Sequence, residues 1–275
     1  MRKQLIIWMV MLWSVFSAAG QVRYPNAVAG PEGIYVNCGN RIPRDFAYQV
    51  FRRAKGGKTW EEMATIACEN HFDAFFNKVV LANVHNPVYQ LPTDEKKGMI
   101  WQLVQQASFA DSIPLFGTLP MYREALGVTW YDGTAEKGQK YEYKVVTLQA
   151  GRQPEEQITP AVSYPLTPRS DYGIKVSEHE VQGDRIDLSF TIGNKQDMYA
   201  AKLMRGYYLQ SDLVPLSIRV GFRSENDVST AIVTDTAAVR RGLVLYCLQP
   251  YDIYGNPGRP SDTIRITNLT DLDET

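Results

Sequence analysis

The chain has 275 residues, 44% of them hydrophobic, and its 29 basic and 30 acidic side chains give a formal net charge of −1. Neither charge forms a long block, so the composition argues against a nucleic-acid-binding protein. Three cysteines cannot all pair within one molecule, which excludes a disulfide-rich scaffold.

Residues 1–20 have the pattern of a secretory signal peptide. Arg2 and Lys3 precede an apolar run from Leu5 to Phe16, and small residues follow up to Gly20. This order is typical of a cleaved export signal. A membrane-spanning helix needs about 20 apolar residues, more than this run contains. We therefore expect a mature chain that is secreted, periplasmic or at the cell surface, with no transmembrane segment.

Period-two patterns predict the strands of a first β module at 21–167. Phe46, Tyr48 and Val50 alternate with other residues, which indicates a strand with one buried face. A turn rich in glycine and lysine at 54–58 predicts a hairpin with the next strand. The predicted strands are Gly33–Cys38, Phe46–Arg52, Trp60–Ile66, Val128–Tyr131, Tyr141–Leu148 and Ala161–Tyr164.

Within this module, at about 68–127, the apolar period changes to that of a helix. A first helical stripe consists of Phe72, Phe75, Phe76, Val79 and Val80. A second helix is indicated by an N-cap at Thr93 and an apolar face of Ile100, Leu103, Val104 and Ala107, and a short third helix runs from Pro120 to Leu126 and stops at Gly127. We expect a helical insertion where a simple sandwich has a short loop.

Prolines 165 and 168 mark a boundary before a second β module at 168–270, followed by a tail at 271–275. The same order of strands recurs here, including a strand that ends in arginine and a late strand led by tyrosine, so the two modules form a repeat. The predicted strands are Ile174–Val181, Arg185–Ile192, Ala200–Arg205, Leu216–Phe222, Ser229–Val233, Leu243–Tyr251 and Thr263–Thr267.

The segment Tyr246–Ile266 resembles the last two strands of a fibronectin type III domain. The matching positions are Tyr246, Leu248, Pro250, Asp252, Gly255, Asn256, Pro260 and Ser261. The resemblance implies a mainly β fold of two Ig-like or fibronectin type III β-sandwiches. The inserted α-helical subdomain of the first sandwich is predicted from the helical apolar period and is foreign to the family pattern. One departure is the family's buried tryptophan on the second strand, since Phe190 occupies that position in the second module and Val36 or Cys38 in the first.

The remaining chemistry gives no support to an enzyme. His71, His85 and His179 have no cysteine or histidine at metal-ligand spacing, so we expect no metal and no cofactor. Neither a nucleophile elbow nor a phosphate-binding loop is present in the sequence. Cys38 and Cys68 lie in the same module and are either bridged or simply buried, and we interpret Cys247 as a packing residue.

Four aromatic residues of the insertion lie outside or at the edge of its helical stripes. If they are exposed, they are candidates to anchor a protein or a sugar ring, and the alternative is that they pack the insertion onto the sandwich. These candidate binding residues are Trp101, Phe109, Phe116 and Tyr122.

The sequence therefore suggests a non-catalytic module for binding, adhesion or scaffolding, at the surface or in the periplasm of a bacterial envelope. The expected partner is a protein or a carbohydrate of the cell envelope, with no nucleic acid. The alternative is a set of accessory domains of a secreted enzyme that processes polysaccharide or protein and has its catalytic domain elsewhere. Whether the reading frame continues beyond Thr275 discriminates between them.

Overall fold

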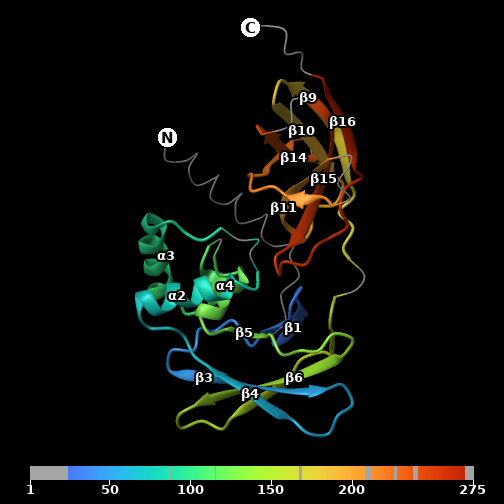
Figure 1. Ribbon diagram of the computed structural model, residues 1–275. Helices are drawn as coiled ribbons and strands as arrows, with labels where there is room; N and C mark the ends of the chain where they lie inside the picture. Colours follow the sequence, from blue (N-terminus) through green and yellow to red (C-terminus); the bar gives the residue numbers. More distant parts are fainter. Residues whose placement is uncertain are drawn as a thin grey trace.

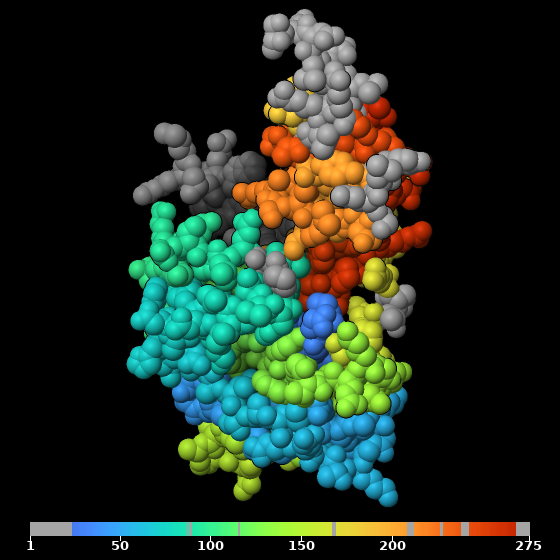
Figure 2. Space-filling model, in the orientation of Figure 1, coloured from blue at the N-terminus to red at the C-terminus, as the bar shows by residue number. Residues whose placement is uncertain are grey.

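The computed structural model describes residues 24–86, 88, 90–114, 116–166, 169–207, 212–225, 228–237 and 241–269. They form two β-sandwiches, with the helices beside the first, as Figure 1 shows. In Figure 2 the atoms of the helical insertion adjoin those of the second sandwich. The predicted signal peptide at 1–20 and the tail at 271–275 lie outside the described residues.

The first sandwich consists of two antiparallel sheets, with strand orders β1-β2-β5 and β4-β3-β6-β7, and β8 pairs with β6. The expected alternation of β3 is confirmed, because Phe46, Tyr48 and Val50 are all buried. Strand β7 was not expected, since all four of its residues are exposed and carry no apolar pattern. The strands are β1 (Asn26–Ala29), β2 (Ile34–Asn37), β3 (Phe46–Ala54), β4 (Glu61–Ile66), β5 (Thr129–Asp132), β6 (Lys140–Gln149), β7 (Glu155–Ile158) and β8 (Val162–Ser163).

The predicted helical insertion lies between β4 and β5. Its buried stripe includes Phe75, Phe76 and Val79, whereas Phe72 and Val80 at the margins are exposed. Gly127 ends the last helix with φ +70°, and a Cβ there would overlap the backbone of Ala67, so this position requires glycine. The elements are α2 (Phe72–Ala82), α3 (Asp94–Gln106), the 3₁₀ turn η2 (Ala110–Ser112) and α4 (Pro120–Ala125).

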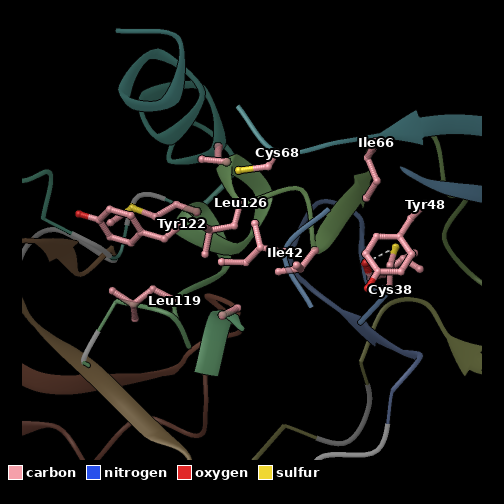
Figure 3. Packing of buried hydrophobic residues seen from close by; sticks show 14 of the residues in the cluster. Cys38, Ile42, Tyr48, Ile66, Cys68, Leu119, Tyr122 and Leu126 are labelled. Atoms are coloured by element: carbon pink, nitrogen blue, oxygen red, sulfur yellow. Dashed lines mark hydrogen bonds between the residues drawn. The ribbon is translucent and has the colours of Figure 1, made fainter. Parts of the chain in front are cut away.

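The insertion and the first sandwich share one hydrophobic core. Figure 3 shows this core running from Tyr48 and Ile66 on the strands to Tyr122 and Leu126 at α4. Cys38 and Cys68 belong to the same core, and both are free and buried. The two thiols are therefore small core residues, the second of the two alternatives left open by the sequence.

The second sandwich also has two antiparallel sheets, with orders β13-β14-β10-β9 and β12-β11-β15-β16. When the strands are lettered along the chain, these sheets are D-E-B-A and C′-C-F-G, the arrangement of an Ig-like or fibronectin type III-like sandwich. The strands are β9 (Ile174–Gln182), β10 (Arg185–Ile192), β11 (Met198–Tyr207), β12 (Val214–Pro215), β13 (Gly221–Glu225), β14 (Val228–Asp235), β15 (Arg241–Asp252) and β16 (Ile264–Leu269).

The core of the second sandwich follows the predicted alternation of β10, with Ile186, Leu188, Phe190 and Ile192 buried. Phe190 is fully buried where the fibronectin family has tryptophan. One strand prediction was wrong, because 216–220 is not a strand. The alternating apolar residues suit a strand, but this segment carries the chain from β12 in one sheet to β13 in the other and cannot pair with either along its length.

Both sandwiches contain the same buried network of an aspartate, a tyrosine and an arginine. In the second, Asp235 accepts hydrogen bonds from Tyr246 Oη at 2.7 Å and Arg205 Nη1 at 2.8 Å. In the first, Asp132 accepts from Tyr143 Oη at 2.7 Å and Arg52 Nη1 at 3.0 Å. The tyrosine follows the aspartate by 11 residues in both cases. The predicted repeat therefore extends to a polar network.

Candidate functional site

A cleft of about 950 Å³ lies between the helical insertion and the second sandwich. This volume is in the range of about 300–1,000 Å³ typical of ligand pockets. The insertion contributes residues around the start of α3 and of α4, and the second sandwich contributes β11 and the segment after β12. The cleft therefore depends on both parts of the chain.

The wall from the insertion is mainly apolar. Leu91 and Met99 line its outer part and are 44% and 51% exposed. Deeper in the cleft, the rings of Phe116 and Tyr122 lie edge to face with centroids 5.3 Å apart. This packing fixes the inner wall, because an edge-to-face pair holds both rings in place.

The wall from the second sandwich opens where the chain leaves the sheet. Strand β12 pairs with β11 at Met204 and Arg205 only. One further hydrogen bond joins the Leu216 amide to the Leu203 carbonyl oxygen, at 2.9 Å. Beyond it, residues 216–220 diverge toward the other sheet, and both they and residues 199–202 of β11 line the cleft.

The charged side chains of this lining are all cationic. They are Lys96 from the insertion and Lys202 and Arg219 from the second sandwich, and no aspartate or glutamate lines the cleft. Lys202 Nζ lies 5.7 Å from the centroid of the Tyr251 ring. None of the three forms an ion pair with a carboxylate within the part of the chain that the structure describes. Their charge is therefore available to an anionic group in the cleft.

The four predicted aromatic residues do not form one surface. Phe116 and Tyr122 line the cleft, but Tyr122 is 2% exposed, so the expectation that it is an exposed aromatic was wrong. The reason is that α4 packs into the shared core. Trp101 is half-buried with its ring 5.5 Å from that of Phe75, and Phe109 is 51% exposed and lies outside the cleft lining.

The sequence did not indicate the contribution of the second sandwich to the cleft. Lys202 and Arg219 lie in segments that the sequence suggests are ordinary strands, and Tyr199 directly precedes the first of them. Periodicity does not report where a strand leaves its sheet.

A turn of the second sandwich fixes its position on the first. The Asp252 carboxylate accepts hydrogen bonds from the backbone of Tyr254 and Asn256, at 2.9 and 2.8 Å. The turn then reaches across the junction: Asn256 Nδ2 donates to the Ala29 carbonyl oxygen at 2.7 Å, and Asn37 Nδ2 donates to Tyr254 Oη at 3.2 Å. The motif that resembles the fibronectin family therefore also joins the two sandwiches.

Arg123 of α4 connects the insertion to the first sandwich. It is 4% exposed and donates to the carbonyl oxygens of Gly39 and Gly117 at 2.8 and 3.2 Å. It also donates to Thr129 Oγ1 at 3.2 Å and Asp111 Oδ1 at 3.0 Å. A planar guanidinium with several donors suits such a set of fixed acceptors.

A histidine and a glutamate form a second contact within the insertion. His85 Nε2 lies 3.1 Å from Glu124 Oε1, and the His85 ring stacks on Tyr131 with centroids 3.6 Å apart. Burial raises the pKa of Glu124, and the hydrogen bond from His85 and the charge of Lys78 oppose that shift only in part. All of these contacts hold structural elements together, and none places a nucleophile beside the pair.

The raised pKa of Glu124 predicts a decline of stability with pH. The folded protein holds this proton more tightly than the unfolded chain, so the free energy of unfolding falls as pH rises from the unfolded pKa through the folded one. In Glu124→Gln this decline is expected to be smaller, and urea unfolding at a series of pH values from 2.5 to 8 measures the difference.

Asp187→Asn is the control of opposite sign, because the hydrogen bonds from Arg185 and Thr234 lower the pKa of Asp187. Its stabilising contribution is present above the unfolded pKa and is lost as pH falls. A constant difference between Glu124→Gln and the wild-type protein over the whole pH range would contradict the role given to Glu124.

Among the described residues, no group of three or more histidine, cysteine, aspartate or glutamate side chains is arranged to hold a metal ion. Within the same part of the chain, no helix is long and apolar enough to cross a membrane.

No protein-family model matches the sequence, and no curated protein is similar to it at a significant level. Solved structures that are similar in shape include the following three. The FN1–FN3 domains of chicken CNTN1 align with 90% of this chain and 67% of theirs, at 10% identity and a TM-score of 0.33. A segment of two fibronectin type III domains from chicken tenascin aligns with 88% of this chain and 96% of its own, at 7% identity and a TM-score of 0.27.

The third structure is the purple acid phosphatase PPD1 from yellow lupin seeds, with 86% of this chain and 38% of that chain covered, at 11% identity and a TM-score of 0.28. At these values the fold assignment depends on the strand order of the sandwiches, and no function is transferred.

Proposed function

We propose that this chain is a non-catalytic module for binding, adhesion or scaffolding that acts at the cell surface or in the periplasm of a bacterial envelope. Its partner is a protein or a carbohydrate of that envelope. The observation that supports the proposal is the cleft between the insertion and the second sandwich, because it is concave, mainly apolar and cationic. The export signal expected at 1–20 supports the location.

The proposal gives each part of the chain a role in forming the cleft. Residues 21–167 and 168–270 act as two sandwich domains that hold the walls of the cleft, and the insertion at about 68–127 contributes the aromatic wall. Removing the insertion is a poor test, because its helices share a core with the first sandwich. Single substitutions on the two walls test the proposal instead.

The substitutions are Met99→Ser on the insertion and Phe222→Ser on the second sandwich, which are 51% and 39% exposed and line the cleft. Each is expected to weaken binding at least tenfold in a screen of envelope glycans and envelope proteins by surface plasmon resonance. Removing a well-packed apolar anchor typically costs about 1–2 kcal/mol or more of binding free energy.

Phe109→Ser is the matched control, because Phe109 is an exposed aromatic of the insertion that lies outside the cleft. Its binding is expected to equal that of the wild-type chain. If Phe109→Ser abolished binding and the two cleft variants did not, the binding surface would be elsewhere on the insertion and the proposed cleft would be rejected.

A further inference from the structure

The cleft contains an open edge of strand β11. On one side, β11 pairs with β15 from Met198 to Tyr207. On the other, its pairing with β12 is restricted to Met204 and Arg205. Among the described strands, none pairs with this edge beside residues 200–202, which line the cleft.

The backbone of Ala201 points toward this open edge. Ala201 is opposite Pro250 in the ladder with β15, and proline has no backbone N–H. In an antiparallel ladder, hydrogen-bonded and non-hydrogen-bonded pairs alternate, so Ala201 belongs to a non-bonded pair and its N–H and C=O face the other side. Leu203, two residues further on, confirms the direction, because its carbonyl oxygen accepts from Leu216 on that side at 2.9 Å.

An open strand edge is a template for another extended chain. Peptides that add to such an edge gain affinity from main-chain hydrogen bonds and specificity from pockets for alternate side chains. The cleft that Ala201 lines offers apolar surface for some side chains of such a peptide and cationic groups for others. Phe116 and Ile218 form apolar surface, and Lys202 and Arg219 are cationic.

We infer that the cleft takes an extended polypeptide segment of a protein partner, in which apolar side chains alternate with carboxylates and which adds as a short strand to the edge of β11. This inference rests on the proposed binding function and names the class of partner. A fatty acid would suit the apolar wall and the cations but would leave the backbone of Ala201 without a partner. A sugar has no run of donors and acceptors at strand spacing.

The test is a library of random heptapeptides displayed on phage and selected on the full chain. The expected consensus alternates apolar residues with aspartate or glutamate. A synthetic peptide of that consensus is then measured by fluorescence anisotropy against the variants Ala201→Pro and Arg219→Glu. Each is expected to weaken its binding at least tenfold.

Ala201→Pro removes only the N–H that faces the cleft, because Ala201 forms no hydrogen bond with Pro250 across the β15 ladder, and proline is tolerated on strand edges. Ala201→Ser keeps this N–H and is the matched control for it. Lys175→Glu, at an exposed position of β9, is the matched control for the charge reversal. Both controls are expected to bind the peptide as the wild-type chain does. Arg219→Glu provides an independent reading if Ala201→Pro does not fold.

Three results would overturn the inference: no enriched peptide, a basic consensus, or binding that Ala201→Pro and Arg219→Glu leave unchanged. Two N-methylated forms of the peptide each block every second amide, one form for each of the two alternating sets. Displacement of the peptide by both forms would also count against strand addition. Should envelope glycans or oleate bind in the cleft when no peptide is selected, the proposed binding function would stand and the polypeptide partner would fall. If no peptide is selected and Met99→Ser abolishes the binding of an envelope partner found in the screen, the proposed binding function would likewise stand and the extended polypeptide partner would fall.

Discussion

Asp235→Ala is expected to lower the free energy of unfolding of the second sandwich by about 3–5 kcal/mol, the usual cost of breaking a buried ion pair from one side. Asp235 is 2% exposed and accepts hydrogen bonds from Arg205, from Tyr246 and from the backbone amide of Ala237 at 3.0 Å. Without its carboxylate, the Arg205 charge and the buried Tyr246 hydroxyl lose their partner. Urea unfolding followed by far-UV circular dichroism measures the effect.

The same experiment on the first sandwich is an internal replicate. Asp132 is fully buried and accepts from Arg52, from Tyr143 and from the Thr134 amide at 3.0 Å, so Asp132→Ala is expected to cost a similar amount. Trp60, Trp101 and Trp130 lie in the first sandwich and its insertion, and the sequence has no tryptophan after Trp130, so in the mature chain tryptophan fluorescence reports on the first sandwich and its insertion and not on the second. The two variants therefore have separable signals.

The control is an exposed ion pair of the same chemistry. Asp171 and Arg259 are 3.4 Å apart, with side chains 58% and 73% exposed. Exposed pairs contribute only about 0–1 kcal/mol, so Asp171→Ala is expected to be nearly neutral. If Asp235→Ala and Asp132→Ala were as mild as Asp171→Ala, the shared network would not be a source of stability in either sandwich.

The second large effect is expected for Arg123→Leu, which should destabilise the first sandwich and its insertion by about 3–5 kcal/mol. The buried guanidinium donates to two backbone carbonyl oxygens, to Thr129 and to Asp111. Each buried acceptor left without a donor costs about 1–3 kcal/mol, and leucine replaces none of these hydrogen bonds. Unfolding followed by tryptophan fluorescence measures the loss.

Arg123→Lys separates charge from geometry. Lysine keeps the positive charge but has no planar fork, so it satisfies only part of the acceptor set, and an intermediate loss is expected. The same variants connect stability to the site, because Arg123 belongs to α4 together with Met121 and Tyr122, which line the cleft. A loss below about 1 kcal/mol for Arg123→Leu would mean that apolar packing alone holds α4 in place.

Local patterns were sufficient for most of the elements, for a clear physical reason. In β10 the alternating residues predicted the observed strand, because a half-buried strand repeats every two residues. The stripe from Phe72 to Val79 predicted α2, because a helix that covers a core repeats every 3.6 residues. The failures were segments without such a repeat, such as the fully exposed β7, or with a misleading one, such as 216–220.

The candidate site was predicted only in part. Phe116 and Tyr122 were identified from the sequence, but through an expected exposure that Tyr122 does not have. The opposite wall was missed because no local pattern connects Lys202 or Arg219 with residues about 100 positions earlier in the chain. For the repeated network, the sequence indicated the recurring arginine and tyrosine but not the aspartate. Its aspartate precedes the tyrosine by 11 residues and carries no periodic signal.

The sequence by itself determined that the chain is mainly β, repeated, and interrupted by helices, because those properties follow from the spacing of apolar side chains along the backbone. Only the tertiary structure decided that the insertion shares the first core, that the turn at Asp252 joins the two sandwiches, and that a cationic cleft opens along β11. Those features depend on contacts between distant segments, and a contact of that kind has no signature in the spacing of neighbouring residues.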